Sequence, residues 1–95
     1  AIFSCLEDKE LSGIVQPLRE VIDEWHCVGL DCWRGQSGQA VFDKLVNVLP
    51  NATACVYENV DAIAPILFEQ AEEQDIILVF GSFHTVADFV LFLEK

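Results

Sequence analysis

The sequence predicts an α/β fold: a three-layer, Rossmann-like, doubly wound and mainly parallel sheet with helices on both faces. Two observations carry this prediction. Apolar runs of strand length alternate with segments in which apolar residues recur every three or four positions, the spacing of one helix face. The strand-like runs are also continuously apolar, which is typical of parallel strands covered on both sides. We therefore expect strands and helices to alternate, four of each, in a single domain spanning residues 1–95.

The first half of the chain is expected to form two strands and two helices. Residues 1–6 are a continuous apolar run typical of a buried strand, and the apolar spacing over residues 11–22 predicts a helix. Pro17 falls inside that helix, so a kink or an irregular turn is expected there. Residues 25–30 are the second predicted strand, and Ser37 can cap the helix that follows it.

The second half repeats the pattern. Residues 54–57 are a short third strand, and residues 60–71 have helical spacing, in which Pro65 is tolerated only near the helix start. Residues 76–80, Ile-Ile-Leu-Val-Phe, are the fourth predicted strand. That strand stops at a glycine, and Ser82 opens a last amphipathic helix.

The composition restricts the classes of partner. Sixteen acidic side chains against five basic ones give a net charge of −11, which repels nucleic acids and anionic membranes, because binding to phosphates requires clustered Lys and Arg. No apolar run approaches the roughly 20 residues of a membrane span, and no signal-peptide pattern opens the chain. We therefore expect a cytoplasmic protein that binds neither nucleic acid nor membrane.

The four cysteines form no Cys-x-x-Cys pair, so neither a zinc knuckle nor a redox motif is indicated. Cys5, Cys27 and Cys55 lie in strand-like segments, where a reduced cysteine behaves as a small buried apolar residue. The alternative is a metal site formed by Cys27, Cys32 and His26.

Ligand binding in such a sheet is expected where the carboxyl ends of the strands meet. The most informative segment there is Gly81-Ser82-Phe83-His84, at which the last predicted strand passes into a helix. Glycine allows close approach of the backbone, and the N–H groups of a first helical turn attract anions. Lys9, after the first strand, adds a positive charge at the same edge. We predict an anion site that uses the backbone at Gly81 and Phe83, with Ser82, His84 and Lys9 beside it.

Each of these side chains also has a purely structural interpretation. Ser82 can be the N-cap of the last helix. His84 can be a half-buried group bonded to a carbonyl, and Lys9 can be a solvated side chain between two acids. Trp33 and Arg34, in the loop after the second strand, fit a stacked surface pair.

Two kinds of catalysis are disfavoured by the motifs. Ser82 and His84, two residues apart at a helix start, point about 200° apart and cannot form a nucleophile–base pair. The segment also lacks the Gly-x-Ser-x-Gly pattern of hydrolases. No segment matches the phosphate-binding loop G-x-x-x-x-G-K-[ST], so nucleotide phosphates are not expected to bind in that mode.

Three segments are specific enough to suggest a family. They are Gly-Ser-Phe-His-Thr-Val-Ala at 81–87, Cys-Leu-Glu-Asp-Lys-Glu at 5–10, and Asp-Glu-Trp-His-Cys at 23–27 with the Arg-Gly turn at 34–35. In this order they resemble the C-terminal domain of the bifunctional dihydrofolate synthase/folylpolyglutamate synthase family, which is related to the Mur ligases. The first segment is the most specific. The second departs from the family pattern, because Glu10 stands where aspartate is usual.

The resemblance implies a function for a longer parent protein. Such enzymes use ATP and Mg²⁺ to phosphorylate a substrate carboxylate, and the amine of L-glutamate attacks the acyl phosphate of a dihydropteroate or folate substrate. Residues 1–95 would be most of the C-terminal domain, in which Ser82, with His84 and Lys9 beside it, contacts the glutamate carboxylate. ATP and Mg²⁺ would bind mainly to an N-terminal P-loop domain. That domain and the family's Asp-x-Ala-His-Asn-Pro segment are absent, so the chain alone is not expected to catalyse.

Two other classes stay open at this point. One is a self-standing acidic α/β binding domain similar to response regulators, in which Asp8 would lie near a strand end. Such modules need several acids at one edge and a lysine at the end of the last strand, which Ser82-Phe83-His84 does not provide. The other is a structural interaction domain of a larger assembly. The residues also leave open whether the parent makes dihydrofolate, polyglutamates or both.

Overall fold

The sheet has four parallel strands. The computed structural model describes residues 1–7 and 9–94, and Asp8 and Lys95 lie outside that description. The strands are β1 (Ile2–Phe3), β2 (Trp25–Val28), β3 (Ala54–Tyr57) and β4 (Val79–Phe80). They lie in the order β3-β2-β1-β4. Because all four strands are parallel, their carboxyl ends meet at one edge of the sheet.

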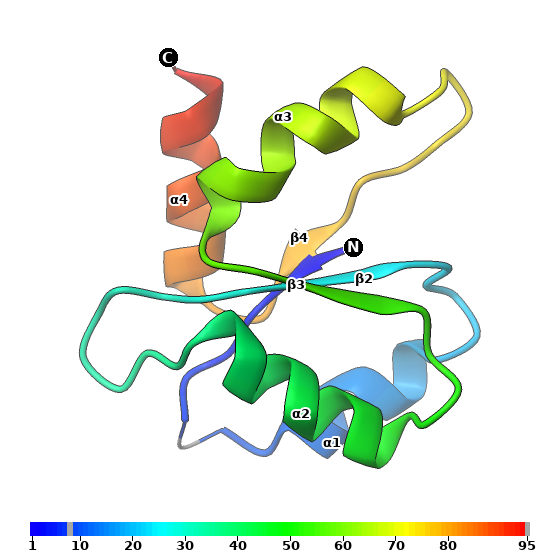
Figure 1. Cartoon of the computed structure of the whole chain (residues 1–95), viewed down its shortest axis with the longest axis vertical. Helices are drawn as coiled ribbons and strands as arrows, with labels where there is room; N and C mark the ends of the chain where they lie inside the picture. Colours follow the sequence, from blue (N-terminus) through cyan, green and yellow to red (C-terminus); the bar gives the residue numbers. More distant parts are fainter. Residues whose placement is uncertain (8, 95) are drawn as a thin grey trace.

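Helices cover both faces of this sheet (Figure 1). One face carries α1 (Leu11–Val15), the 3₁₀ helix η1 (Gln16–Leu18) and α2 (Gly38–Val48), and the other carries α3 (Val60–Gln70) and α4 (Phe83–Leu93). The chain moves from β1 to β3 in one direction and then returns past β1 to β4, which makes the sheet doubly wound. The predicted fold class is confirmed.

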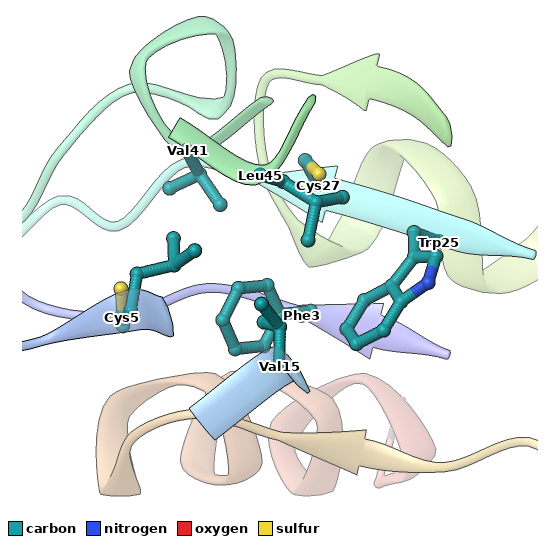
Figure 2. Close-up of a cluster of buried hydrophobic side chains, with 8 residues drawn as sticks. Phe3, Cys5, Val15, Trp25, Cys27, Val41 and Leu45 are labelled. Atoms are coloured by element: carbon teal, nitrogen blue, oxygen red, sulfur yellow. The ribbon is translucent and has the colours of Figure 1, made fainter. Parts of the chain in front are cut away.

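The larger core cluster fills the space between the sheet and helices α1 and α2. Figure 2 shows Cys5, Phe3 and Trp25 spread along the sheet, with Val41 and Leu45 reaching towards them from α2. The rings of Phe3 and Trp25 meet edge to face, with centroids 5.5 Å apart. Such pairs add to the free energy of apolar burial. The cluster therefore holds β1 against β2 and α2.

A second cluster covers the opposite face of the sheet. It consists of Ile2, Val28, Val60, Ile63 and Ala64, which are all buried. Helix α3 provides three of these residues, so burial of this helix face holds α3 on the sheet. The two clusters together bury both faces of β1 and β2, as the continuously apolar strands predict.

Three strands are shorter than predicted, and one of them, β2, ends at Val28 instead of Leu30. The ladder between β1 and β4 includes only the pairs Ile2–Val79 and Phe3–Phe80, although the apolar runs suggested strands over 1–6 and 76–80. The pairs of β4 begin at Val79, so the apolar residues that precede Val79 lie outside this ladder. Ile76 is 89% exposed as a result.

Three smaller predictions were also tested. The irregularity expected at Pro17 is confirmed, because α1 ends at Val15 and a 3₁₀ turn follows. Pro65 was expected only near the start of a helix, and this prediction is wrong, because Pro65 lies inside α3. Its ring is exposed, while its neighbours Ile63 and Ala64 are buried. The predicted burial of Cys55 is wrong too, because β3 is the outer strand on its side of the sheet.

Candidate functional site

The predicted anion segment lies where β4 passes into α4, next to the end of β1. Gly81 has a φ of 116°, a value that favours glycine. A Cβ atom on this residue would lie 1.6 Å from the carbonyl oxygen of Ser4. The turn therefore requires glycine, and it brings the backbone of Gly81 directly against the chain that leaves β1.

Ser82 caps helix α4, as its structural interpretation predicted. Its Oγ accepts a hydrogen bond from the backbone N–H of Thr85 at 3.2 Å and lies 3.0 Å from the Oγ1 of the same residue. Either hydroxyl can donate in the second contact. When the buried Thr85 hydroxyl donates, the hydrogen of Ser82 is left for another acceptor. Capping therefore leaves Ser82 able to donate to an anion.

Phe83 and His84 form the first turn of α4 and are both exposed. Phe83 is 94% exposed, which is unusual for so large an apolar side chain. The alternative that His84 is half-buried is wrong, because its ring lies at the surface. The N–H groups of a first helical turn have no partner within the helix. Those of Phe83 and His84 therefore lie at the positive end of α4.

Lys9 lies in the loop that follows β1. Its side chain is exposed, and its backbone N–H donates to the carbonyl of Leu6 at 3.1 Å. Since β1 and β4 are neighbours, this loop and the Gly81 turn emerge side by side at the carboxyl edge. The sheet therefore brings Lys9 to the same edge as Ser82 and His84. Asp8, in the same loop, lies outside the described residues.

A hollow at this edge is acidic, and neither Ser82 nor Lys9 of the predicted anion site lines it. It has a volume of about 860 Å³ and lies between the ends of β2 and β3 and the last turns of α4. Five carboxylate side chains line it: Asp31, Glu58, Asp61, Asp88 and Glu94. An anion is therefore repelled from the hollow.

Two loops at the edge are joined by contacts that the sequence did not reveal. The amide of Gln36 donates to the Cys5 carbonyl at 2.9 Å, and Lys44 Nζ donates to the Oε1 of Gln36. The backbone N–H of Glu7 also donates to the carbonyl of Arg34. Gln36 is buried, so this network fixes the start of the Lys9 loop. A single glutamine in a polar loop has no sequence pattern that announces such a role.

Arg34 stacks on Trp33, as the sequence predicted. Its guanidinium carbon lies 4.4 Å from the centre of the indole ring, and Trp33 is 82% exposed. Arg34 also has a positive φ of 64°, which is uncommon outside glycine. The pair therefore presents a flat, cationic surface beside the carboxyl edge.

The described residues do not form a metal site. No group of three or more His, Cys, Asp or Glu among residues 1–7 and 9–94 is arranged to hold a metal ion. The alternative based on Cys27, Cys32 and His26 is wrong, because adjacent residues of a strand point to opposite faces. Burial instead raises the pKa of the Cys27 thiol to about 12, so it stays protonated. These residues therefore do not fit a divalent metal.

Comparison with known proteins places this geometry in a family. A family model described as "Mur ligase, glutamate ligase domain" matches residues 1–83. This chain belongs to that family. The dihydrofolate synthase/folylpolyglutamate synthase of Haemophilus influenzae is 43% identical over 95 residues, which is 99% of this chain and 22% of that protein. The protein of the same name from Escherichia coli is 31% identical over 87 residues, which is 92% of this chain and 19% of that protein.

Solved structures support the assignment to the Mur ligase glutamate ligase domain. A bifunctional folylpolyglutamate synthase/dihydrofolate synthase from Yersinia pestis superimposes with a TM-score of 0.81 at 32% identity, over 99% of this chain and 21% of that one. A second structure of this Yersinia enzyme, complexed with AMPPNP and Mn, gives a TM-score of 0.78. The chain thus spans about one fifth of the relatives it matches, at their C-terminal part. None of its described helices is long and apolar enough to cross a membrane.

Proposed function

We propose that this chain is the C-terminal domain of an ATP-dependent ligase, here called the parent, that joins L-glutamate to dihydropteroate or folate through an acyl phosphate. Family membership favours this function over a self-standing acidic module or a structural interaction domain. In this proposal the domain spans residues 1–95 and holds glutamate, while ATP and Mg²⁺ bind mainly to the N-terminal ATPase domain of the parent. The chain alone is then inactive.

The proposal depends above all on the start of α4. Ser82 caps the helix through its oxygen and can still donate its own hydrogen, and the N–H groups of Phe83 and His84 lie beside it. A carboxylate placed there accepts hydrogen bonds from the hydroxyl and the backbone, at the positive end of the helix. Gly81 lets the ligand approach the backbone closely.

Charge supports the same position. Lys9 lies in the loop that follows the neighbouring strand β1, and its flexible stem lets the ammonium follow a bound carboxylate. The exposed ring of His84 adds a further N–H donor. The five carboxylates of the hollow beyond β2 repel the same anion, so glutamate is confined to the side near β1 and β4. In this arrangement Ser82, Lys9 and His84 orient glutamate, and the activated acyl group comes from the rest of the parent.

The four cysteines support a cytoplasmic location for the parent. All four are free thiols in the structure, although two of them lie close to the surface. Free, accessible thiols are typical of reducing compartments, where disulfides are rare.

The test is to replace Ser82 with alanine in the full-length parent. Loss of a charge-assisted hydrogen bond of about 1.5–3 kcal/mol raises the KM for glutamate roughly ten- to a hundred-fold. The KM for ATP changes little, because its phosphates bind the other domain. Steady-state kinetics with varied glutamate and ATP measure both constants.

Ser37→Ala is the matched control. Ser37 caps α2 as Ser82 caps α4, accepting from the N–H of Ala40 at 3.1 Å. Both substitutions therefore remove one cap, which costs about 1 kcal/mol of stability. Only Ser82→Ala should alter glutamate binding. If both variants lose stability and neither changes the KM for glutamate, Ser82 is a cap without a binding role and the proposed site is wrong.

A further inference from the structure

The side chain of Phe83 makes little contact with the rest of the protein. It is 94% exposed, more than any other large apolar side chain that the structure describes. The phenylalanines further along α4 differ from it, because Phe89 and Phe92 pack against Phe68 of α3. A ring of this size left in water loses the stabilisation that burial supplies. Among the described residues, packing therefore gives no reason for an aromatic ring at position 83.

The ring of Phe83 is directed towards the proposed glutamate site. Phe83 is the first residue of α4. The Cα–Cβ bonds of a helix tilt towards its N-terminus, so this side chain points towards the space in front of the helix. Thr85 is fully buried, and two residues correspond to a rotation of about 200° around the helix axis. The ring therefore lies on the outer side of the first turn, beside the position proposed for the carboxylate.

Glutamate bound at this position brings the acyl substrate close to Phe83. The amine of glutamate lies about 2.5 Å from the carbon of its α-carboxylate. A nucleophile that is ready to react lies about 3–3.5 Å from the carbon that it attacks. When the N–H groups of Phe83 and His84 hold the α-carboxylate, the acyl carbon lies within about 6 Å of that carboxylate. The group bonded to the acyl carbon then comes within range of the Phe83 ring.

The two acids considered for the parent differ in this group. In dihydropteroate the reacting carboxyl group is bonded directly to an aromatic ring. In folate it ends the aliphatic side chain of a glutamyl residue, so the aromatic ring lies a whole residue further away. Two aromatic rings in contact attract each other by more than burial alone provides. An aromatic residue at position 83 therefore favours the acid whose ring lies next to the reacting carbon.

We propose that the side chain of Phe83 contacts the aromatic ring of an acyl substrate whose carboxyl group is bonded directly to that ring. Phe83 thereby favours dihydropteroate over folate. The inference rests on the proposed function and on glutamate binding at the start of α4. It gives the side chain of Phe83 a role in substrate selection, in addition to the role of its backbone N–H in the anion site.

Trp33 provides the matched control. It is the other aromatic side chain that is more than half exposed among the described residues, at 82%. It also lies at the carboxyl edge, but in the loop that follows β2, where Arg34 stacks on its ring. Replacement of Trp33 therefore removes an exposed ring from the same edge without changing the start of α4.

The substrate preference of the full-length parent tests the proposal. This preference is the ratio of kcat/KM for dihydropteroate to kcat/KM for folate, at saturating ATP and glutamate. Phe83→Ala should lower the ratio roughly tenfold. Phe83→Tyr, which keeps the ring, should hold the ratio near the wild-type value, and Trp33→Ala should leave it unchanged. For an acid that binds but is not converted, the inhibition constant replaces kcat/KM.

Four results overturn the proposal. The first is an unchanged ratio in Phe83→Ala. The second is an equal fall in kcat/KM for both acids, because the ring then supports glutamate binding or the fold. The third is an equal fall of the ratio in Trp33→Ala, because any exposed ring at this edge then has the same effect. The fourth is a parent that neither converts nor binds dihydropteroate.

Ser82→Ala separates this inference from the proposed function. It should raise the KM for glutamate with both acids alike, because glutamate is common to the two reactions. If Ser82→Ala has this effect and Phe83→Ala leaves the ratio unchanged, only the role of the Phe83 side chain is wrong. If Ser82→Ala leaves the KM for glutamate unchanged, the proposed glutamate site is wrong.

Discussion

Gly81 and Gln36, at the carboxyl edge of the sheet, have structural roles that their residue types alone do not indicate. Gly81 permits a turn that no other residue fits without movement of the Ser4 backbone. Gln36 holds the Cys5 carbonyl from a loop on the neighbouring strand. Gln36 acts by placing the backbone at the start of the Lys9 loop, whereas Gly81 places Ser82 and also lets an anion approach its own backbone in the proposed site. Among the described residues, Gln36 is therefore a positioning residue, whereas Ser82, Lys9 and His84 are proposed to bind the anion.

Gly81→Ala should destabilise the protein strongly. The new Cβ meets the Ser4 carbonyl at 1.6 Å, and the backbone keeps a φ of 116°. Strain and displacement together cost roughly 3 kcal/mol or more. Equilibrium urea unfolding measures the loss.

Gly13→Ala provides the control for this experiment. Gly13 lies inside α1, and an added Cβ would have no atom within 4 Å. Alanine should therefore stabilise the protein by about 0.5–1 kcal/mol through higher helix propensity. If both substitutions change stability by similar amounts, the tight contact between Gly81 and Ser4 is not a determinant of the fold.

At the scale of helices and strands, the sequence predicted which element follows which, but not how far each extends. The apolar spacing located all four helices, because one helix face must pack on the sheet. The lengths of β1 and β4 were not predictable, since ladder length depends on the neighbouring strand and not on local hydrophobicity. Exposure of Cys55 follows from the place of β3 at an edge, which an apolar run does not encode. The cap at Ser82 was predictable from the strand–glycine–serine pattern, whereas the Gln36 contacts depend on tertiary structure alone.

Helix α3 forms although it contains Pro65, a residue of low helix propensity. Pro65 removes one backbone hydrogen bond in its interior, at a cost of about 3 kcal/mol relative to alanine. Proline also restricts the unfolded chain, which returns about 0.4–1 kcal/mol. Pro65→Ala should therefore stabilise the protein by about 2 kcal/mol, as measured by urea unfolding.

Pro17→Ala is the comparison for the helix experiment. Pro17 occupies the start of η1, where its ring geometry is compatible with the turn. Its replacement should lower stability by about 0.4–1 kcal/mol, because only the unfolded state changes. A loss of stability in Pro65→Ala as well would show that the ring of Pro65 makes packing contacts that outweigh its missing donor.

The whole molecule should lose stability in alkaline solution. Burial raises the pKa of Cys27 from its ordinary value of 9.0 to about 12. Below pH 9 the thiol is protonated in both states, and its contribution to stability is complete. Between pH 9 and 12 it ionises only in the unfolded state, so stability falls by up to about 4 kcal/mol.

Denaturant titrations at several pH values measure this dependence. Cys27→Ala should flatten the fall above pH 9, whereas Cys32→Ala should leave it unchanged, because Cys32 is not among the groups that shift the pKa of Cys27. An equal slope in all three proteins would show that Cys27 ionises in the folded state as readily as a free thiol.

The strand order has a consequence for how the domain forms during synthesis. β1 pairs with β2 on one side and with β4 on the other, so the centre of the sheet joins the two ends of the chain. Pairings between distant segments form slowly, because a long loop must close first. As the chain leaves the ribosome, β2, α2 and β3 can assemble early. One side of β1 stays open until β4 emerges, and through that interval the nascent domain is most exposed to misassembly.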